Sequence, residues 1–244
     1  MTEPSTASVR VDSGLEMFVA PHHRRAPAVL AHDGTATLGH LVESLGVPLP
    51  EVGELLVDGR PAAAEQQPRA GAEVEVRAVR RPQRVRPRFL LDVHLGKLAR
   101  RLRLLGVDAA WRNDAADDEL IERANRENRL LLTRDRWLLR RRALPRGAYV
   151  RGTRADDQLA DVLDRFAPPL APWTRCTACN GELHPVSKQD VSGQVQPGTR
   201  RCYHRFARCG ACGKAYWRGA HSGRLDQVVS AARAAHPDHR DESP

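Results

Sequence analysis

The stretch from Arg88 to Arg142 reads RFLLDVHLGKLARRLRLLGVDAAWRNDAADDELIERANRENRLLLTRDRWLLRRR. It places an acid after each of two apolar runs, because Asp92 ends FLLD and Asp135 follows LLLT. Two strand-like runs, each followed by a helix, are typical of a parallel α/β sheet. Ligands bind such sheets beyond the carboxyl ends of the strands, which is where these acids fall.

Between these two acids lies an acidic cluster, formed by Asp114, Asp117, Asp118 and Glu119. Carboxylates that meet at one edge repel each other unless a cation lies between them, and Mg²⁺ or Mn²⁺ prefers oxygen ligands. Each acid also has an ordinary local role, since Asp is a good N-cap and acids suit the first turn of a helix. The joint pattern at three strand–helix junctions favours a shared metal site.

The composition indicates a folded protein with a basic surface. The 244 residues suffice for one large domain or for two to three small ones, and the formal charge is +9. Such a charge suits a polyanionic partner such as nucleic acid. The basic residues are nearly all arginine, which is also the amino-acid bias of a GC-rich genome, so part of this charge is expected to be solvated surface.

Targeting signals are not expected. No apolar run approaches the roughly 20 residues that a membrane span needs. The first residues, MTEPSTASVRVDSG, lack the basic and apolar regions of a signal peptide. We therefore expect a cytoplasmic protein that does not enter a membrane.

The N-terminal part predicts a small α+β module. SVRVD reads as a strand and LEMFVAP as its hairpin partner, and Thr37 is placed to cap a helix that ends at Gly46. GELLVDGRP predicts a strand and a turn at Asp58-Gly59, and AGAEVEVRAV a final strand. This order is that of a β-grasp, or ubiquitin-like, fold.

The stretch LGHLVESLGVPLPEVGELLVDGRP resembles small sulfur carriers of that fold. Such carriers end in an exposed Gly-Gly, whereas this module runs on into RAVRRPQRVRPR, which argues against sulfur chemistry. We expect a module that docks a protein partner or a substrate.

The central part predicts four β–α units. The helix HLGKLARRLRLLG has one apolar face, at Leu95, Leu98, Leu102 and Leu105, and is closed by Gly106. DDELIERANREN, RWLLRRRAL and ADDQLADVLDRFA predict the other helices. Trp111, Trp137 and Tyr149 are expected to pack in the core or at its rim.

The five cysteines all lie in the last third. CTACNGEL and CGACGKAYWRG form a C-x₂-C…C-x₂-C set, at Cys176, Cys179, Cys209 and Cys212. Two such turns give a tetrahedral site of four thiolates, which selects Zn²⁺ and, being closed, is structural. Reduced free thiols or a redox pair are the alternatives. Cys202 is expected to be a spare thiol, although RCYH keeps a substitute ligand open.

The predicted organisation follows from these patterns. The expected segments are, in order, a disordered tail (1–7), a β-grasp domain (8–79), a linker (80–87), an α/β domain (88–169), a zinc ribbon (172–221) and a C-terminal tail (222–244).

Three motifs together resemble a known family: FLLDVHLGKLARRLRLLG, DDELIERANRENRLLLTRDRWLLRR and the paired cysteine turns that end in YWRG. They are similar to the PIN-like ribonuclease domain called the Mut-seven C-terminal RNase domain, whose bacterial members often carry a β-grasp module in front. The resemblance covers about residues 8–221. It implies a PIN-like Rossmannoid parallel sheet with helices on both faces, an appended zinc ribbon and a metal-dependent RNase activity.

The resemblance also implies site residues. The first PIN acid matches Asp92, the acid of the D-E-[LI] motif matches Glu119 with Asp118 beside it, and the T-x-D acid matches Asp135. A fourth acid, frequent in PIN nucleases, has only Asp156 or Asp157 as candidates, several residues late.

The sequence thus predicts a Mg²⁺- or Mn²⁺-dependent ribonuclease that acts on RNA, with structural zinc. Nearby arginines are expected to hold flanking phosphates without reading sequence, namely Arg100, Arg101, Arg103, Arg134 and Arg136. The alternative is a non-catalytic RNA- or ribosome-binding protein with a zinc ribbon. A β-grasp adaptor in sulfur transfer is a third and more distant option.

Overall fold

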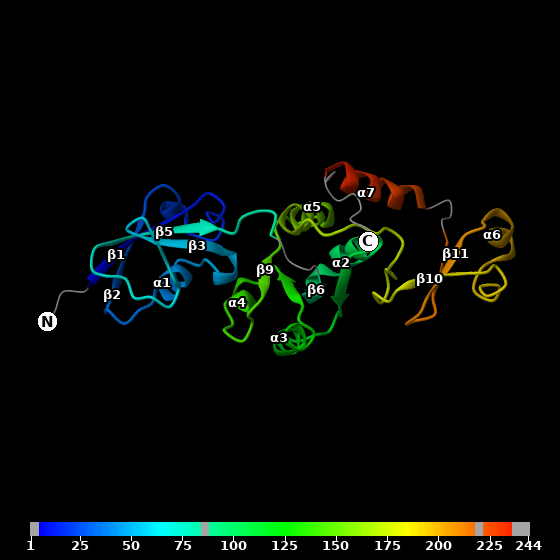
Figure 1. Ribbon diagram of the computed structural model, residues 1–244, viewed down its shortest axis with the longest axis horizontal. Helices are drawn as coiled ribbons and strands as arrows, with labels where there is room; N and C mark the ends of the chain where they lie inside the picture. Colours follow the sequence, from blue (N-terminus) through cyan, green and yellow to red (C-terminus); the bar gives the residue numbers. More distant parts are fainter. Residues whose placement is uncertain (1–4, 84–87, 218–221, 236–244) are drawn as a thin grey trace. The chain divides into compact units, whose positions relative to one another are not determined.

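The computed structural model describes residues 5–83, 88–217 and 222–235 (Figure 1). The chain divides into two compact units, and each is considered separately. The first joins the described residues up to Arg81 with the segment Thr133–Tyr149. The second contains Pro82–Leu132 and the described residues from Val150 onward.

The N-terminal part contains a five-stranded mixed sheet of order β2-β1-β5-β3-β4. β1 is parallel to β5, and the pairs β1/β2 and β3/β4 are antiparallel, as in a β-grasp fold. The elements are β1 (Ser5–Val11), η1 (Pro21–Arg24), β2 (Ala28–His32), α1 (Leu38–Ser44), η2 (Leu49–Glu51), β3 (Val52–Val57), β4 (Arg60–Ala62) and β5 (Ala72–Ala78).

Local signals in this domain act as the sequence predicts. Thr37 caps α1 by accepting a hydrogen bond from the backbone N–H of His40, at 3.2 Å. Gly46, just past the helix, has φ 97°, which suits glycine. Asp58 and Gly59 join β3 to β4 with φ of 49° and 77°. Positive φ at both central residues is the signature of the type I′ turn that closes tight hairpins.

Two details of the N-terminal prediction are wrong. The hairpin partner of β1 is β2 and not LEMFVAP, which forms turns. Leu15, Phe18 and Val19 are buried in those turns, and their spacing of three and four residues suits a coiled backbone better than an alternating strand. The expected tail is also shorter, because β1 already begins at Ser5; residues 1–4 lie outside the described part.

The central part contains a four-stranded sheet of order β7-β6-β8-β9, in which β6 is parallel to both β7 and β8. Figure 1 shows α5 on one side of these strands and α3 on the other, as the predicted fold requires. The elements are β6 (Arg88–Leu91), η3 (Val93–Leu95), α2 (Gly96–Leu104), β7 (Asp108–Trp111), α3 (Asp117–Arg126), β8 (Leu130–Thr133), α4 (Arg136–Leu139), β9 (Gly147–Tyr149) and α5 (Ala155–Phe166).

The apolar face predicted for the helix HLGKLARRLRLLG is confirmed, because its four leucines, from Leu95 to Leu105, are at most 1% exposed. Gly106 follows α2 with φ 83°, and a Cβ there would collide with the backbone carbonyl of Ala171. The helix after β8 is shorter than expected, since α4 ends at Leu139. Three consecutive arginines follow it, and Pro145 disfavours helix at the residue before it.

The C-terminal part contains a three-stranded antiparallel sheet of order β10-β11-β12. A small core of Val191, Val195, Phe206 and Ala215 fills the long connection between the two cysteine pairs. The elements are β10 (Leu183–Val186), α6 (Pro197–Cys202), β11 (Phe206–Cys209), β12 (Ala215–Trp217) and α7 (Ser222–Ala235).

Two expectations concern the chain ends and membranes. The disorder expected for residues 236–244 lies outside the described part. None of the described helices has the length and apolar character to cross a membrane.

Candidate functional site

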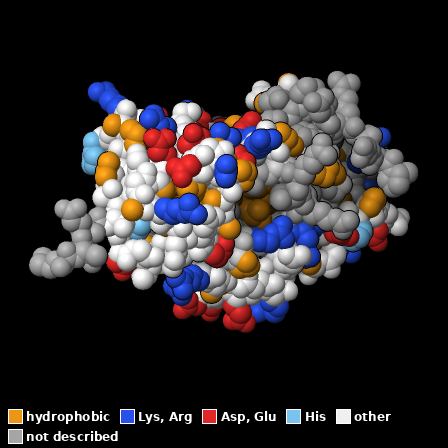
Figure 2. Space-filling view, turned by 60° about the vertical axis from the view of Figure 1, so that its left-hand side comes forward, with side chains coloured by type: hydrophobic (Ala, Val, Ile, Leu, Met, Phe, Trp, Pro, Cys, Tyr) orange, Lys and Arg blue, Asp and Glu red, His pale blue; other side chains and the backbone are white. Residues whose placement is uncertain are grey.

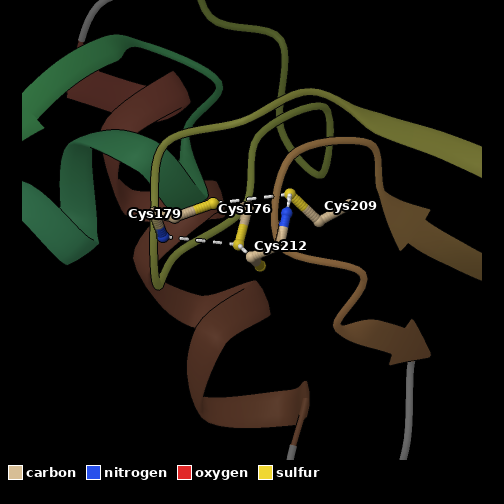
Figure 3. A group of neighbouring side chains, drawn as sticks. All are labelled: Cys176, Cys179, Cys209 and Cys212. Atoms are coloured by element: carbon tan, nitrogen blue, oxygen red, sulfur yellow. Dashed lines mark hydrogen bonds between the residues drawn. The ribbon is translucent and has the colours of Figure 1, made fainter.

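Four cysteine side chains converge between two loops of the C-terminal part (Figure 3). The ligand atoms of Cys176, Cys179, Cys209 and Cys212 all lie within 4.8 Å of one another. The Sγ atoms of Cys176 and Cys212 are 3.7 Å apart, and those of Cys179 and Cys209 are 3.4 Å apart. A tetrahedral Zn²⁺ with bonds of about 2.3 Å to sulfur would separate the sulfurs by about 3.8 Å. The cluster is therefore consistent with a structural zinc site.

The two loops repeat one local geometry. In each, the N–H of the second cysteine points at the Sγ of the first, at 3.4 Å for Cys179 and 3.5 Å for Cys212. The residue after the second cysteine has positive φ, 73° at Asn180 and 72° at Gly213. In each loop its N–H donates to the first cysteine's carbonyl, at 2.9 Å. Two equal turns that face each other present four sulfurs to one point.

The neighbouring thiols change each other's pKa. Burial raises the pKa of Cys176, but hydrogen bonds from Tyr216 and from backbone N–H groups outweigh it and lower that pKa to about 6. Burial and hydrogen bonding among the neighbouring thiols raise the pKa of Cys179 to about 12. Opposite shifts at adjacent thiols are expected when one thiolate disfavours the ionisation of the next. A divalent cation removes that repulsion.

Cys202 is not part of this group. It ends α6 and is exposed, and among the described residues the metal-binding group contains the other four cysteines. Cys202 therefore lies outside the four-cysteine group, and its interpretation as a spare thiol stays a prediction.

The first cysteine loop, 176–181, is attached to the α/β part by Arg103. The guanidinium of Arg103 donates to the carbonyls of Ala109, Thr177 and Ala178, at 2.7, 3.2 and 2.8 Å. Arg103 is 1% exposed, so our expectation that it holds a flanking phosphate is wrong. Arg103 follows the apolar Leu102 on α2, so nothing in the local sequence indicates that its charge is buried. Its partners come from β7 and from the cysteine loop, which only the tertiary structure brings close.

Asn180 makes a second attachment. Its side chain accepts from the N–H of Ala109 at 3.0 Å and donates to Asp108 at 2.7 Å. Asp108 also pairs with Arg129, at 2.7 Å. Burial raises the pKa of Asp108, but the hydrogen bonds from Arg129 and Asn180 outweigh it and hold that pKa below its usual value. The cysteine loop and the edge strand β7 thus share one ionic network.

The predicted carboxylates lie at the ends of neighbouring strands. Leu91 of β6 pairs with Leu132 of β8, and the N–H of Asp92 donates to the carbonyl of Leu132 at 3.0 Å. Asp92 caps η3 by accepting from Val93 at 2.5 Å and is 6% exposed. Asp135 follows β8 and caps α4 by accepting from Trp137 and Leu138, at 2.7 and 3.3 Å. Both acids thus perform the capping role that was weighed for them.

The other two candidate acids, Asp118 and Glu119, are exposed in the first turn of α3. Among the described residues, the ligand atoms of the four cysteines lie within 4.8 Å of one another. The candidate carboxylates do not form a group of three or more that lies so close together. Asp92, Asp118 and Glu119 belong to the second unit, whereas Asp135 belongs to the first. The late candidates for a fourth acid begin α5, where Asp156 pairs with Arg101.

The arginines expected to bind phosphate differ in their surroundings. Arg100 and Arg134 are exposed, and Arg101 is half-buried beside Asp156. Arg136 donates to the carbonyls of Met17 and Phe18, at 2.8 and 3.3 Å. Its guanidinium also lies 5.1 Å from the centre of the Phe18 ring. Arg136 therefore joins the segment after β8 to the β-grasp domain.

The positive charge is unevenly distributed along the chain. Residues 8–79 contain six arginines against ten acids, whereas residues 172–217 contain seven basic residues against two acids. On the face drawn in Figure 2, acidic and basic side chains lie close together. The β-grasp domain is thus the acidic part of a basic protein, and the cysteine-rich part is strongly basic.

Two family models match the chain. The model described as the Mut7-C RNAse domain matches residues 87–229, and the one described as Mut7-C ubiquitin matches residues 4–84. The first match covers more than half of the sequence.

The chain belongs to the Mut7-C RNase domain family.

No curated protein and no solved structure matched the chain in these comparisons. The Mut7-C RNase match runs from β6 into α7, so it includes the cysteine-rich part together with the α/β part. The Mut7-C ubiquitin match contains the whole five-stranded sheet. The resemblance seen in the sequence is confirmed over both parts.

Sequence reasoning missed some residues of this Mut7-C protein. Asn180 and Arg103 tie the cysteine loop to β7, and Trp137, expected to pack, is 74% exposed with Arg140 4.9 Å from its ring centre. The sequence did offer a signal for Asn180. The first cysteine pair is followed by Asn180, whereas the second is followed by Gly213. Asn tolerates positive φ and adds a hydrogen-bonding side chain. The neighbours of Arg103 and Trp137 depend on contacts between elements.

Proposed function

We propose that this protein is a metal-dependent ribonuclease that hydrolyses RNA phosphodiester bonds. The observation that carries the proposal is its membership of the Mut7-C RNase domain family over residues 87–229. The strand ends support it, because Asp92 and Asp135 follow the neighbouring strands β6 and β8. The carboxyl edge of a parallel sheet is where such folds bind their substrates.

The residues that would hold Mg²⁺ or Mn²⁺ are Asp92, Glu119 and Asp135, with Asp118 beside them. The donor set fits, because hard divalent cations prefer carboxylate oxygens. Asp92 is 6% exposed, so its carboxylate is largely shielded from water. A bound cation would supply a water of lowered pKa and stabilise charge on the leaving oxygen. Exposed Arg100 and Arg134 would hold the phosphates beside the cleaved bond.

The four-cysteine centre would hold Zn²⁺ as a structural ion. All four coordination positions would be filled by thiolates, which leaves none for a substrate. Reduced cysteines also suit a reducing compartment, so we propose the cytoplasm as the location.

The test uses Asp92→Asn and Asp135→Asn in the full chain. Asn caps helices about as well as Asp, so these substitutions keep the capping role of each residue and remove only the charge. We expect RNA cleavage with Mg²⁺ or Mn²⁺ to fall by about 100-fold or more in each variant, with the thermal unfolding midpoint nearly unchanged. Asp114→Asn, in the exposed pair with Arg112, is the matched control and should cleave normally.

The rival function makes the opposite prediction. A non-catalytic RNA-binding protein would bind RNA equally well after both substitutions, and it would show no cleavage with any divalent ion. Normal cleavage by Asp92→Asn would also reject the assigned carboxylate site.

A further inference from the structure

A cleft of about 210 Å³ lies on the cysteine-rich part. Aromatic rings dominate its walls, with one cation among them: it is lined by Trp173, Leu183, Arg205, Phe206, Ala207, Tyr216 and Trp217. Small-molecule sites usually measure about 300–1,000 Å³, so this cleft suits one flat ring system and not a larger ligand.

The walls come from four separate pieces of chain, namely the segment before the first cysteine loop and the regions of β10, β11 and β12. Phe206 of β11 pairs directly with Trp217 of β12, and Tyr216 pairs with Ala207. Trp173 precedes the first cysteine loop with φ 68°, a conformation that bulky residues rarely adopt, and its N–H donates to the carbonyl of Leu104 at 3.3 Å. Trp217 remains 37% exposed although it is a large apolar side chain. The cleft therefore presents aromatic surface to solvent.

The charge around the cleft selects the ligand. Arg205 lines it, and the ammonium of Lys214 lies 5.9 Å from the centre of the Tyr216 ring. The surrounding residues 172–217 carry seven basic side chains against two acids. An apolar peptide would gain nothing from this charge, whereas a nucleotide has both a ring to stack and a phosphate to pair. Aromatic rings within a basic surface are the usual means of binding single strands.

We propose that this cleft binds an unpaired nucleobase of single-stranded RNA, with Trp217 as the stacking residue and Arg205 on the adjacent phosphate. Bases in a duplex are already stacked on each other, so they do not enter the cleft. The site lies outside the carboxylates of the proposed nuclease centre and acts whether or not the RNA is cleaved.

The test measures anisotropy of a fluorescein-labelled single-stranded RNA with the zinc-loaded full chain and no added Mg²⁺ or Mn²⁺. We expect Trp217→Leu to weaken binding by roughly 5- to 100-fold, because stacking of one base is worth that much. Trp217→Phe should restore most of the affinity, and Arg205→Gln should reduce the salt dependence. Trp137→Leu removes an exposed tryptophan elsewhere and is the matched control, with unchanged affinity.

Three results would overturn the proposal. One is wild-type affinity in Trp217→Leu with its zinc content intact. Another is an equal loss in Trp137→Leu. The third is equal binding of an abasic oligonucleotide, which keeps the phosphates and lacks the bases. A protein that binds RNA in this way and never cleaves it would reject the nuclease and leave the cleft in place.

A different observation concerns the β-grasp domain, which grips the segment 133–149. Glu51 is 1% exposed, and its Oε1 accepts from the N–H of Tyr149 at 2.7 Å. Phe18 packs edge-on against the Tyr149 ring, with 5.2 Å between ring centres. Arg136 donates to two carbonyls of the turn at Met17 and Phe18. These contacts fix both ends of the segment that begins beside Asp135.

We infer that the β-grasp domain positions Asp135 for the proposed nuclease centre, with Glu51 and Arg136 as positioning residues. This inference rests on the proposed function. The sequence predicts an external partner for the β-grasp module. The segment 133–149 of the same chain is a second partner.

The experiment separates positioning from stability. Glu51→Ala should lower kcat of RNA cleavage with KM unchanged, and Glu51→Gln should restore it, because the amide oxygen still accepts from Tyr149. Arg136→Met should behave like Glu51→Ala if it positions Asp135, and should raise KM instead if it contacts RNA. Glu54→Gln, which removes a solvent-exposed 3.0 Å pair with Arg77 within the β-grasp sheet and does not touch the segment 133–149, is the control.

A lower melting temperature with normal kcat in both Glu51→Ala and Arg136→Met would overturn the inference. Failure of the proposed function would appear separately, as no RNA cleavage by the unsubstituted protein with any divalent ion.

Discussion

The cysteine centre and the carboxylate edge are both predicted from the spacing of ligand types, but the structure treats them differently. The four sulfurs meet within 4.8 Å, each held by a local turn. The carboxylates make local contacts instead: Asp92 and Asp135 each cap the helix that follows them in the chain. A site built from two local turns needs only that the turns face each other. A site built from strand ends needs several elements to be placed together.

The sharpest way to test this difference is to remove one sulfur. Cys209→Ser should reduce zinc below one ion per chain, because it removes one of the four thiolate ligands. The effect on folding should be large, since structural zinc contributes about 10–16 kcal/mol to folding of such sites. Backbone amides of β11 and β12 should lose their protection from hydrogen exchange. Cys202→Ser is the matched control and should keep its zinc. A metal-free but fully protected Cys209→Ser protein would contradict the structural role.

The next effect concerns the attachment of the first cysteine loop to α2. Arg103→Met keeps the volume but leaves three carbonyls without a donor, so we expect a loss of about 2–4 kcal/mol in the free energy of unfolding by urea. Arg100→Met on the same helix, where the residue is exposed, should cost little. Equal stability of the two variants would show that the cysteine centre and the sheet are energetically independent.

The carboxylate edge is tested on α3. Glu119→Gln should slow RNA cleavage by about 30-fold, which is about 2 kcal/mol of transition-state stabilisation, with unchanged folding. Asp117→Asn removes a charge from the same first turn and should cleave normally. If both variants slow cleavage alike, the acids act through the general charge of the helix start and not as ligands.

The smallest effect distinguishes the two cysteine loops from each other. Asn180→Gly keeps the positive φ but loses the bonds to Ala109 and Asp108, so it should cost about 1–2 kcal/mol. Gly213→Asn in the other loop meets nothing within 4 Å of its Cβ and tolerates the φ, so it should change stability by about 0.5 kcal/mol at most. Thermal unfolding of both variants measures the difference.

Much of the fold followed from local patterns. The leucine face of α2, the Thr37 cap, the Asp58-Gly59 turn and the order of the sheet elements each depend on residues close together in the chain. The errors arose where the pattern was ambiguous. Leu15 and Phe18 lie in turns, which their spacing suits better than a strand, and α4 ends at Leu139, before the predicted end of that helix.

The sequence by itself determined the cysteine centre, because a C-x-x-C turn folds locally and two of them present four sulfurs whatever lies between. It also determined where carboxylates follow strands. Only the tertiary structure decided what the charges do: that Arg103 is buried against a cysteine loop and that Arg136 is bound by the β-grasp domain. The physical reason is range. A turn is specified by neighbours in the chain, whereas the guanidinium of Arg136 takes a partner from a segment 119 residues away.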